Sequence, residues 1–183
     1  MNNRMHIQRI SDEVFYAQGA VLTFGARDLD FLWSQAGRNP RKRARLCTHR
    51  DVNDPLHEML IINLRDTYVR PHKNLNKPKS FQILEGVMDV VMFDEAGVVH
   101  SAVRLGAYDS GLPYYFRLHQ TRYHTLRTVS ERVLFQETTI GPFQPGDTVF
   151  APWSPEDGQP ECAAFLEDLD RSVAGLAQAG AKA

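Results

Sequence analysis

Two of the seven histidines in the chain stand out because of the side chains around them. His72 lies in the run TYVRPHKN, where a strand would place Tyr68, Arg70, His72 and Asn74 on one side, since strand residues alternate between faces. His124 begins a second strand-like run, YHTL. If both runs border one cavity, a phenol, a guanidinium, an amide and two imidazoles converge there. Such a set can transfer protons or bind an anion or a metal ion.

The elements that would position these residues are mostly short β-type runs separated by Gly, Pro or Asp turn signals. The runs cover residues 14–17, 20–24, 59–62, 67–69, 81–84, 87–93, 98–99, 114–118, 123–129 and 133–140. Many short strands at this spacing favour a closed all-β sandwich or barrel over βαβ units. An open α+β sheet is the alternative.

Helical periodicity flanks the strands on both sides. Apolar residues recur at helical spacing from Asp28 to Gly37, and again every three or four positions from Phe165 to Leu176. We therefore expect a single domain over residues 1–183. Its barrel core covers about 56–150, and a helical and loop extension that includes the hairpin at 14–24 covers 1–55. A C-terminal helix covers about 160–178.

Composition narrows the class of protein. Twenty-one Lys and Arg residues balance 22 Asp and Glu residues, which argues against a general nucleic-acid-binding role. Neither an 18-residue apolar window nor a signal-like stretch is seen, and two cysteines are too few for a disulfide framework. We expect a cytoplasmic protein without a membrane span. The basic segment 38–50 is interpreted as a solvated face, with contact to a phosphate or acidic substrate as the alternative.

Several separate motifs resemble one known superfamily. The stretch YVRPHKNLNKPKSFQILEGVMDVVMFDEAGVV resembles the first cupin signature, and RLHQTRYHTL resembles the second. Together with HRDVNDPLHEML, FQETTIGPF and FAPWSPED, they are similar to the WbuC-type cupin-fold metalloproteins, over about residues 41–157. That resemblance implies an all-β cupin double-stranded β-helix (jelly-roll) barrel with flanking helices. It also implies a link to O-antigen and other surface-polysaccharide metabolism.

The same resemblance implies a divalent metal such as Zn, Fe, Mn or Ni, but only part of the ligand set is present. His72 and His124 match two ligand histidines, whereas Asn74 stands in the second histidine position and Lys79 in the glutamate position. Two unit charges about 4 Å apart, in an effective dielectric near 20, have an interaction energy of about 4 kcal/mol. An ammonium group at this position therefore opposes the binding of a cation. A rearranged ligand set of His72, His124 and Asn74, extended by Glu137 or His119, is the alternative.

A metal-independent interpretation follows from the same substitutions. Lys79 beside Arg70 would make the pocket cationic and attract phosphate or carboxylate groups, as carried by nucleotide-linked sugars. Metal-free cupins that epimerise or isomerise such sugars use a histidine base and a tyrosine acid, and the resemblance assigns these roles to His72 and Tyr68. Lys79 would stabilise an enolate, while Arg70, Asn74 and Glu137 would bind substrate. In the alternative, Tyr68 caps the barrel and the Lys79 ammonium group reaches the rim.

The sequence thus leaves three functional hypotheses open. The first is a sugar or nucleotide-sugar enzyme, of isomerase or epimerase type, with a degenerate metal site. The second is a metal-dependent cupin built on His72 and His124, and the third is a non-catalytic ligand-binding or regulatory cupin. In each, the partner is a small anionic or sugar molecule, and exposed sheet edges favour a homodimer.

Overall fold

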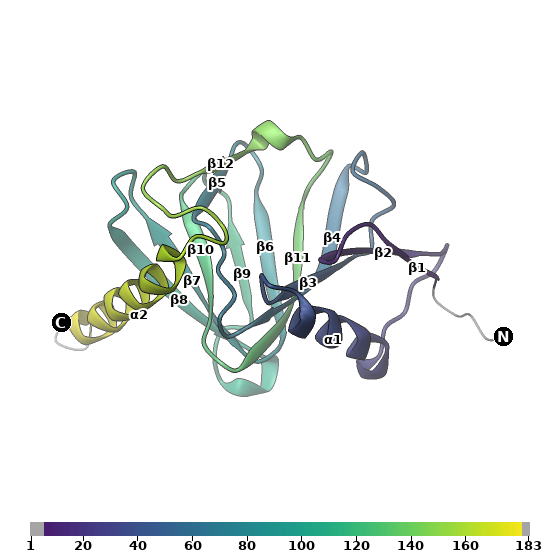
Figure 1. The fold of residues 1–183 in the computed structure, drawn as a ribbon, viewed down its shortest axis with the longest axis horizontal. Helices are drawn as coiled ribbons and strands as arrows, with labels where there is room; N and C mark the ends of the chain where they lie inside the picture. Colours follow the sequence, from purple (N-terminus) through teal and green to yellow (C-terminus); the bar gives the residue numbers. More distant parts are fainter. Residues whose placement is uncertain (1–5, 181–183) are drawn as a thin grey trace.

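Two β-sheets face each other in the computed structural model of the protein, which describes residues 6–180, with side chains described as far as residue 176 (Figure 1). The strands are β1 (His6–Arg9), β2 (Val14–Gln18), β3 (Arg43–Cys47), β4 (Leu56–Leu64), β5 (His72–Asn74), β6 (Lys79–Glu85), β7 (Val87–Phe93), β8 (Val99–Gly106), β9 (Tyr115–Leu118), β10 (His124–Thr128), β11 (Arg132–Ile140) and β12 (Thr148–Phe150). The helices are α1 (Asp30–Arg38) and α2 (Glu161–Gly180), with short 3₁₀ segments η1 (Ala26–Leu29), η2 (Tyr108–Ser110) and η3 (Pro145–Asp147).

The strand order is that of a jelly roll. One sheet runs β1-β2-β3-β4-β11-β6-β9 and the other runs β12-β5-β10-β7-β8. If the eight consecutive strands from β4 to β11 are numbered 1 to 8, one sheet contains them in the order 1-8-3-6 and the other in the order 2-7-4-5. This double Greek-key order is the one found in cupins. The predicted fold class, an all-β jelly-roll barrel of the cupin type with a helix at each end, is confirmed.

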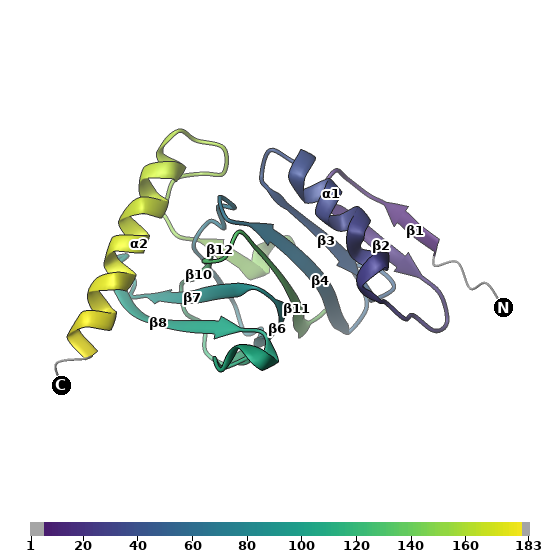
Figure 2. The same cartoon turned by 90° about the horizontal axis from the view of Figure 1, so that it is seen from below.

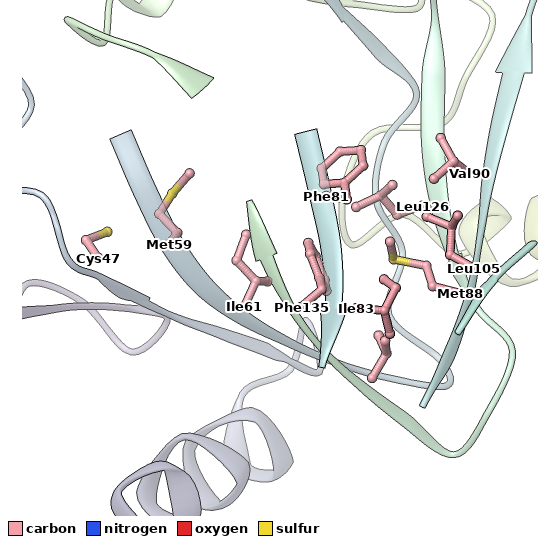
Figure 3. Close-up of a cluster of buried hydrophobic side chains, with 11 residues drawn as sticks. Cys47, Met59, Ile61, Phe81, Ile83, Met88, Val90, Leu105, Leu126 and Phe135 are labelled. Atoms are coloured by element: carbon pink, nitrogen blue, oxygen red, sulfur yellow. The ribbon is translucent and has the colours of Figure 1, made fainter. Parts of the chain in front are cut away.

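Apolar side chains fill one end of the space between the sheets. Ile61, Phe135 and Ile83 of the first sheet point toward Met88 and Val90 of the second (Figure 3). Alternation along β4, β6, β7 and β11 sends these residues inward, as expected for strands with one face on the core. The packed end closes the barrel, so the polar residues lie toward the other end.

The turn that joins β6 in one sheet to β7 in the other depends on one glycine. Gly86 has a φ of +83°, and a Cβ at this position would lie 2.2 Å from the carbonyl oxygen of Arg132. Glycine is favoured where the chain must adopt a left-handed conformation beside another backbone segment. The turn aligns β6, which carries Lys79, next to β11.

Each helix covers the outer face of a sheet (Figure 2). In α1, the fully buried Leu32 and Ala36 pack with Ala44, Leu46 and Ile62 from β3 and β4. In α2, Leu169 belongs to the cluster of Val91 and Phe93 of β7. Among the described residues, neither helix is long and apolar enough to cross a membrane.

The N-terminal region differs from the expectation of helix and loop. The strand predicted at 20–24 is wrong, because that segment is irregular chain and the hairpin forms instead between β1 and β2. The Ser11 hydroxyl accepts hydrogen bonds from the backbone N–H groups of Glu13 and Val14 in the turn. Next to this hairpin, β2 pairs parallel with β3, which extends the barrel sheet alongside β4. Residues 1–5 and 181–183 of the predicted domain lie outside the described residues.

Candidate functional site

A cavity of about 420 Å³ lies between the two sheets, on the open side of the apolar cluster. Its walls come from β2, β3, β4, β11 and β6 of one sheet and from β5, β10 and β12 of the other. The volume is in the range of ordinary small-molecule sites. Six arginine and lysine side chains and four carboxylates line it, so the lining has an excess of positive charge when its histidines are neutral.

His72 and His124 meet in this cavity. They are directly paired across β5 and β10, and their ring centroids are 4.6 Å apart. Nδ1 of His72 lies 2.9 Å from the carbonyl oxygen of Arg70, and Nδ1 of His124 lies 3.0 Å from that of Arg122. A carbonyl oxygen can only accept a hydrogen bond, so each Nδ1 carries the proton and each Nε2 keeps its lone pair. The predicted convergence of the two imidazoles is what the structure shows.

The surroundings keep both rings neutral. Burial, assisted by the Lys79 ammonium group, lowers the pKa of His72 to about 4. The pKa of His124 lies well below its usual value because of burial, then Lys79, then His72. Desolvation and a nearby positive charge both disfavour an imidazolium ion. Both rings are therefore hydrogen-bond acceptors and potential bases at neutral pH.

Lys79 points inward and is paired with Glu137. Its Nζ atom lies 3.4 Å from Oε1 of Glu137, and the two side chains are only 7% and 15% exposed. The alternative in which the ammonium group reaches the rim does not hold, because β6 sends this residue into the space beside Phe81 and the histidine pair. A positive charge thus sits inside the barrel, balanced by one carboxylate from β11.

Asn74 and Arg70 also line the cavity. The Asn74 amide donates to Oγ1 of Thr148 at 3.1 Å. Its buried Oδ1, like Nε2 of His124, has no hydrogen-bond partner within residues 6–180. The Arg70 guanidinium lies 5.0 Å from the centroid of the Phe150 ring and bonds to Glu156 at 3.4 Å. Of the predicted substrate-binding residues, Arg70, Asn74 and Glu137 all reach the cavity.

The structure places Tyr68 outside the cavity, so its predicted position is wrong. Its hydroxyl donates to the carbonyl oxygen of Pro155 at 2.8 Å, and its ring contacts Phe165 of α2 edge-on at 5.8 Å. Burial also raises the pKa of this phenol. The alternation argument fails because residues 67–71 are irregular chain and β5 begins only at His72. His119 also lies outside the cavity, but it is exposed, in the segment after β9.

The donor set does not fit a divalent metal. Two neutral imidazoles and one amide oxygen are present, but the carboxylate of Glu137 is paired with Lys79, whose ammonium group lies close enough to depress the pKa of both histidines. Within residues 6–176, His, Cys, Asp and Glu side chains nowhere gather in a group of three or more that could hold a metal ion. First-row transition metals prefer imidazole and anionic ligands, and a fixed positive charge opposes them.

The interpretation of segment 38–50 as a solvated face does not hold for Arg43 and Arg45 of β3. Both line the cavity, together with Glu13, which precedes β2, and Asn63 of β4. The signal was present, since polar and apolar residues alternate in Arg43–Cys47 with the period of a strand. Contact with a phosphate or acidic substrate, the alternative for this segment, remains a prediction.

Two further histidines occupy the same cavity. The rings of His49 and His57 stack with centroids 4.0 Å apart, and both residues are buried. Burial lowers the pKa of His49, and burial raises the pKa of the adjacent Cys47 thiol to about 11. His57 is not a fully satisfied core residue, because its buried Nε2 lacks a partner among the described residues.

Comparisons with known proteins give no activity for this chain. A family model described as a domain of unknown function (DUF6016) matches residues 24–105. No curated protein matches the chain. Among solved structures, protein SO0799 from Shewanella oneidensis is 10% identical, with a TM-score of 0.45 over 56% of this chain and 66% of that one.

Two cupin proteins are similar at the same level. Oxalate decarboxylase from Bacillus subtilis is 15% identical, with a TM-score of 0.41 over 54% of this chain and 24% of that one. The cupin domain of Schizosaccharomyces pombe Cnp3 is 15% identical, with a TM-score of 0.42 over 54% of this chain and 64% of that one. The chain therefore spans less than two thirds of the length of each of these three proteins. The site must be interpreted from its own geometry.

Proposed function

We propose that this protein is a cupin-barrel enzyme that transfers protons on a small sugar-type substrate without a metal ion. The observation that carries the proposal is the meeting of two neutral imidazoles, His72 and His124, with the ammonium group of Lys79 in one cavity. A base and a cation side by side are what proton abstraction next to a carbonyl requires.

The step assigns roles to His72, Lys79 and Glu137. Nε2 of His72 takes a proton from the carbon next to a substrate carbonyl, and the electron pair of the broken C–H bond moves into an enolate. Lys79, held in place by Glu137, donates a hydrogen bond to the enolate oxygen. Return of the proton to the opposite face of the same carbon then gives the epimer. The low pKa of His72 belongs to the ligand-free cavity, and an anionic substrate would raise it, because a nearby negative charge favours the imidazolium ion.

Polar groups in the cavity support a sugar as the substrate class. Buried oxygen or nitrogen atoms of His57, Asn63, Asn74 and His124 line it without partners within residues 6–180. Sugar hydroxyls can donate hydrogen bonds to the two amide oxygens and to Nε2 of His124. The resemblance to WbuC-type proteins supports a role in surface-polysaccharide metabolism.

Solvent deuterium uptake tests the proposal. We would incubate the protein in D₂O with hexose 6-phosphates and with keto-bearing nucleoside diphosphate sugars, and follow the proton next to the carbonyl by ¹H NMR. Loss of that signal is expected with the parent and with Tyr68→Phe, but not with His72→Asn. If every substrate binds and none exchanges, the protein is a ligand-binding cupin and not an enzyme. Equal exchange by His72→Asn and the parent would remove His72 from the mechanism.

We also propose that the protein is a cytoplasmic homodimer. Both cysteines are unpaired, which suits a reducing compartment. The strands β1 and β9 are the edges of the first sheet, and exposed edges favour pairing between copies. Sedimentation equilibrium tests the dimer, and a monomer at micromolar concentration would contradict it.

A further inference from the structure

The face of β3 that looks into the cavity carries arginine side chains. Ala44 and Leu46 are fully buried on the opposite face, under α1, so alternation along β3 directs Arg43 and Arg45 toward the cavity. Their side chains are 14% and 35% exposed. Guanidinium groups in a concave, partly desolvated wall interact more strongly with an anion than arginines on an open surface.

These arginines are gathered on a single carboxylate. Glu13 bonds with Arg43, with Arg45 at 3.3 Å and with Arg41 at 3.0 Å, and Arg41 also bonds with Asp157 at 2.6 Å. Three positive charges therefore face two negative charges. Each guanidinium has five N–H donors, and the two carboxylates use only some of them. Glu13 orders the cluster and leaves both positive charge and hydrogen-bond donors for a further anion.

An unpartnered polar group lies in the same wall. Asn63 on β4 is directly opposite Arg43 in the sheet, and the residue is 2% exposed. Its Oδ1 atom has no hydrogen-bond partner in the part of the chain that the structure describes. A buried polar atom without a partner costs free energy, so its presence in a cavity wall points to a hydroxyl or amide of a bound molecule as partner.

We propose that this arginine cluster, Arg41, Arg43 and Arg45 with Glu13, is the subsite that holds a phosphate or diphosphate group of the substrate. The inference rests on the proposed function, since the sugar attached to that group would then extend toward His72 and His124 along the same cavity. Arg43 and Arg45 are two residues apart on one strand, about 7 Å, which suits two linked phosphoryl groups. Paired guanidinium forks match the oxygens of a phosphate geometrically.

Calorimetric titration with uridine diphosphate and with inorganic pyrophosphate tests the subsite, with Arg45→Gln as the variant. Arg45 is the more exposed of the two β3 arginines, so its replacement leaves the closer Arg43–Glu13 pair intact. We expect both ligands to bind the parent and to bind Arg45→Gln at least about tenfold more weakly. The matched control is Arg117→Gln, which removes the same charge from an exposed position on β9, and it should bind like the parent.

Three results would overturn the subsite: no binding of either ligand to the parent, equal binding to Arg45→Gln, or tighter binding of glucuronate than of pyrophosphate. Failure of the subsite can be distinguished experimentally from failure of the proposed function. If a neutral keto sugar exchanges deuterium and Arg45→Gln leaves its KM unchanged, while no phosphate binds, the chemistry stands and the subsite is wrong. If uridine diphosphate binds through Arg45 but no sugar exchanges, the subsite stands and the chemistry is wrong.

Discussion

Lys79 determines what the histidine pair can do. Its ammonium group contributes to the low pKa of both His72 and His124 and is itself balanced by Glu137. The barrel therefore contains a fixed positive charge beside two free imidazole lone pairs. A fixed ammonium group and a divalent cation would compete for the same region, and removing the first should admit the second.

The double variant Lys79→Glu with Asn74→His tests this competition. It replaces the ammonium group with a carboxylate and adds a third imidazole next to His72 on β5. We expect Ni²⁺ or Zn²⁺ affinity to rise by about two orders of magnitude over the parent, measured by calorimetry. Asn74→His alone, which retains the ammonium group, is the control and should bind far less metal. Equal metal uptake by the double variant and the parent would mean that these side chains do not surround His72.

The low pKa of His72 predicts how stability depends on pH. Between about pH 6.5 and pH 4, an unfolded chain binds a proton at this residue that the folded chain does not. The contribution of neutral, buried His72 to the free energy of unfolding is therefore complete above pH 6.5. It falls as the pH drops toward 4, by up to about 1.4 kcal/mol per pH unit for each such histidine.

Urea denaturation over this pH range measures the effect. His72→Gln should lose part of the slope, with the remainder coming from His124, whose pKa is also lowered. His100→Gln changes an exposed histidine on β8 and should keep the slope of the parent. A slope in His72→Gln identical to that of the parent would mean that His72 is not held neutral.

At the scale of elements, the strands place the site and the turns set their register. The β6–β7 turn holds β6, and with it Lys79, in line with β11. A residue with a Cβ at Gly86 meets both a positive φ and a backbone oxygen at 2.2 Å. Such a contact forces movement of the β11 backbone, which carries Glu137.

Gly86→Ala should therefore lower the free energy of unfolding by more than about 2 kcal/mol. Gly37→Ala is the matched control, because this glycine lies in α1 with open space around its Cβ position, and the change should be neutral or stabilising by up to about 1 kcal/mol. Both values come from urea denaturation curves. Equal stability of the two variants would mean that the turn does not have the described conformation.

Alternation of polar and apolar residues predicts the strands of the barrel itself, and β3 shows the same alternation. Arg43–Cys47 alternates in the same way as the core strands, but its inward residues are arginines, so the sequence favours a solvated face, with contact to a phosphate or acidic substrate as the alternative. Hydrophobicity alone cannot distinguish a polar cavity wall from solvent. Tyr68 fails for a different reason: the chain before Pro71 is not a strand, and alternation applies only within one.

At the scale of the whole molecule, the predicted fold was correct because it needed only strand count, spacing and motif order. The site needed more. His72 and His124 are 52 positions apart, and only the antiparallel register of β5 and β10 places their rings 4.6 Å apart. The arginine cluster needs the parallel pairing of β2 with β3, which brings Glu13 to residues 28 to 32 positions further along. Such long-range pairings are set by packing of the complete fold.

The most direct test of the account is the protonation state of the two imidazoles. Long-range ¹H–¹⁵N NMR spectra of the ligand-free protein, with His72→Gln and His124→Gln for assignment, report which ring nitrogen carries the proton. We predict that both rings are neutral at pH 6, with the proton on Nδ1 and a free lone pair on Nε2. Imidazolium shifts at pH 6, or a proton on Nε2 of either ring, would contradict the central claim.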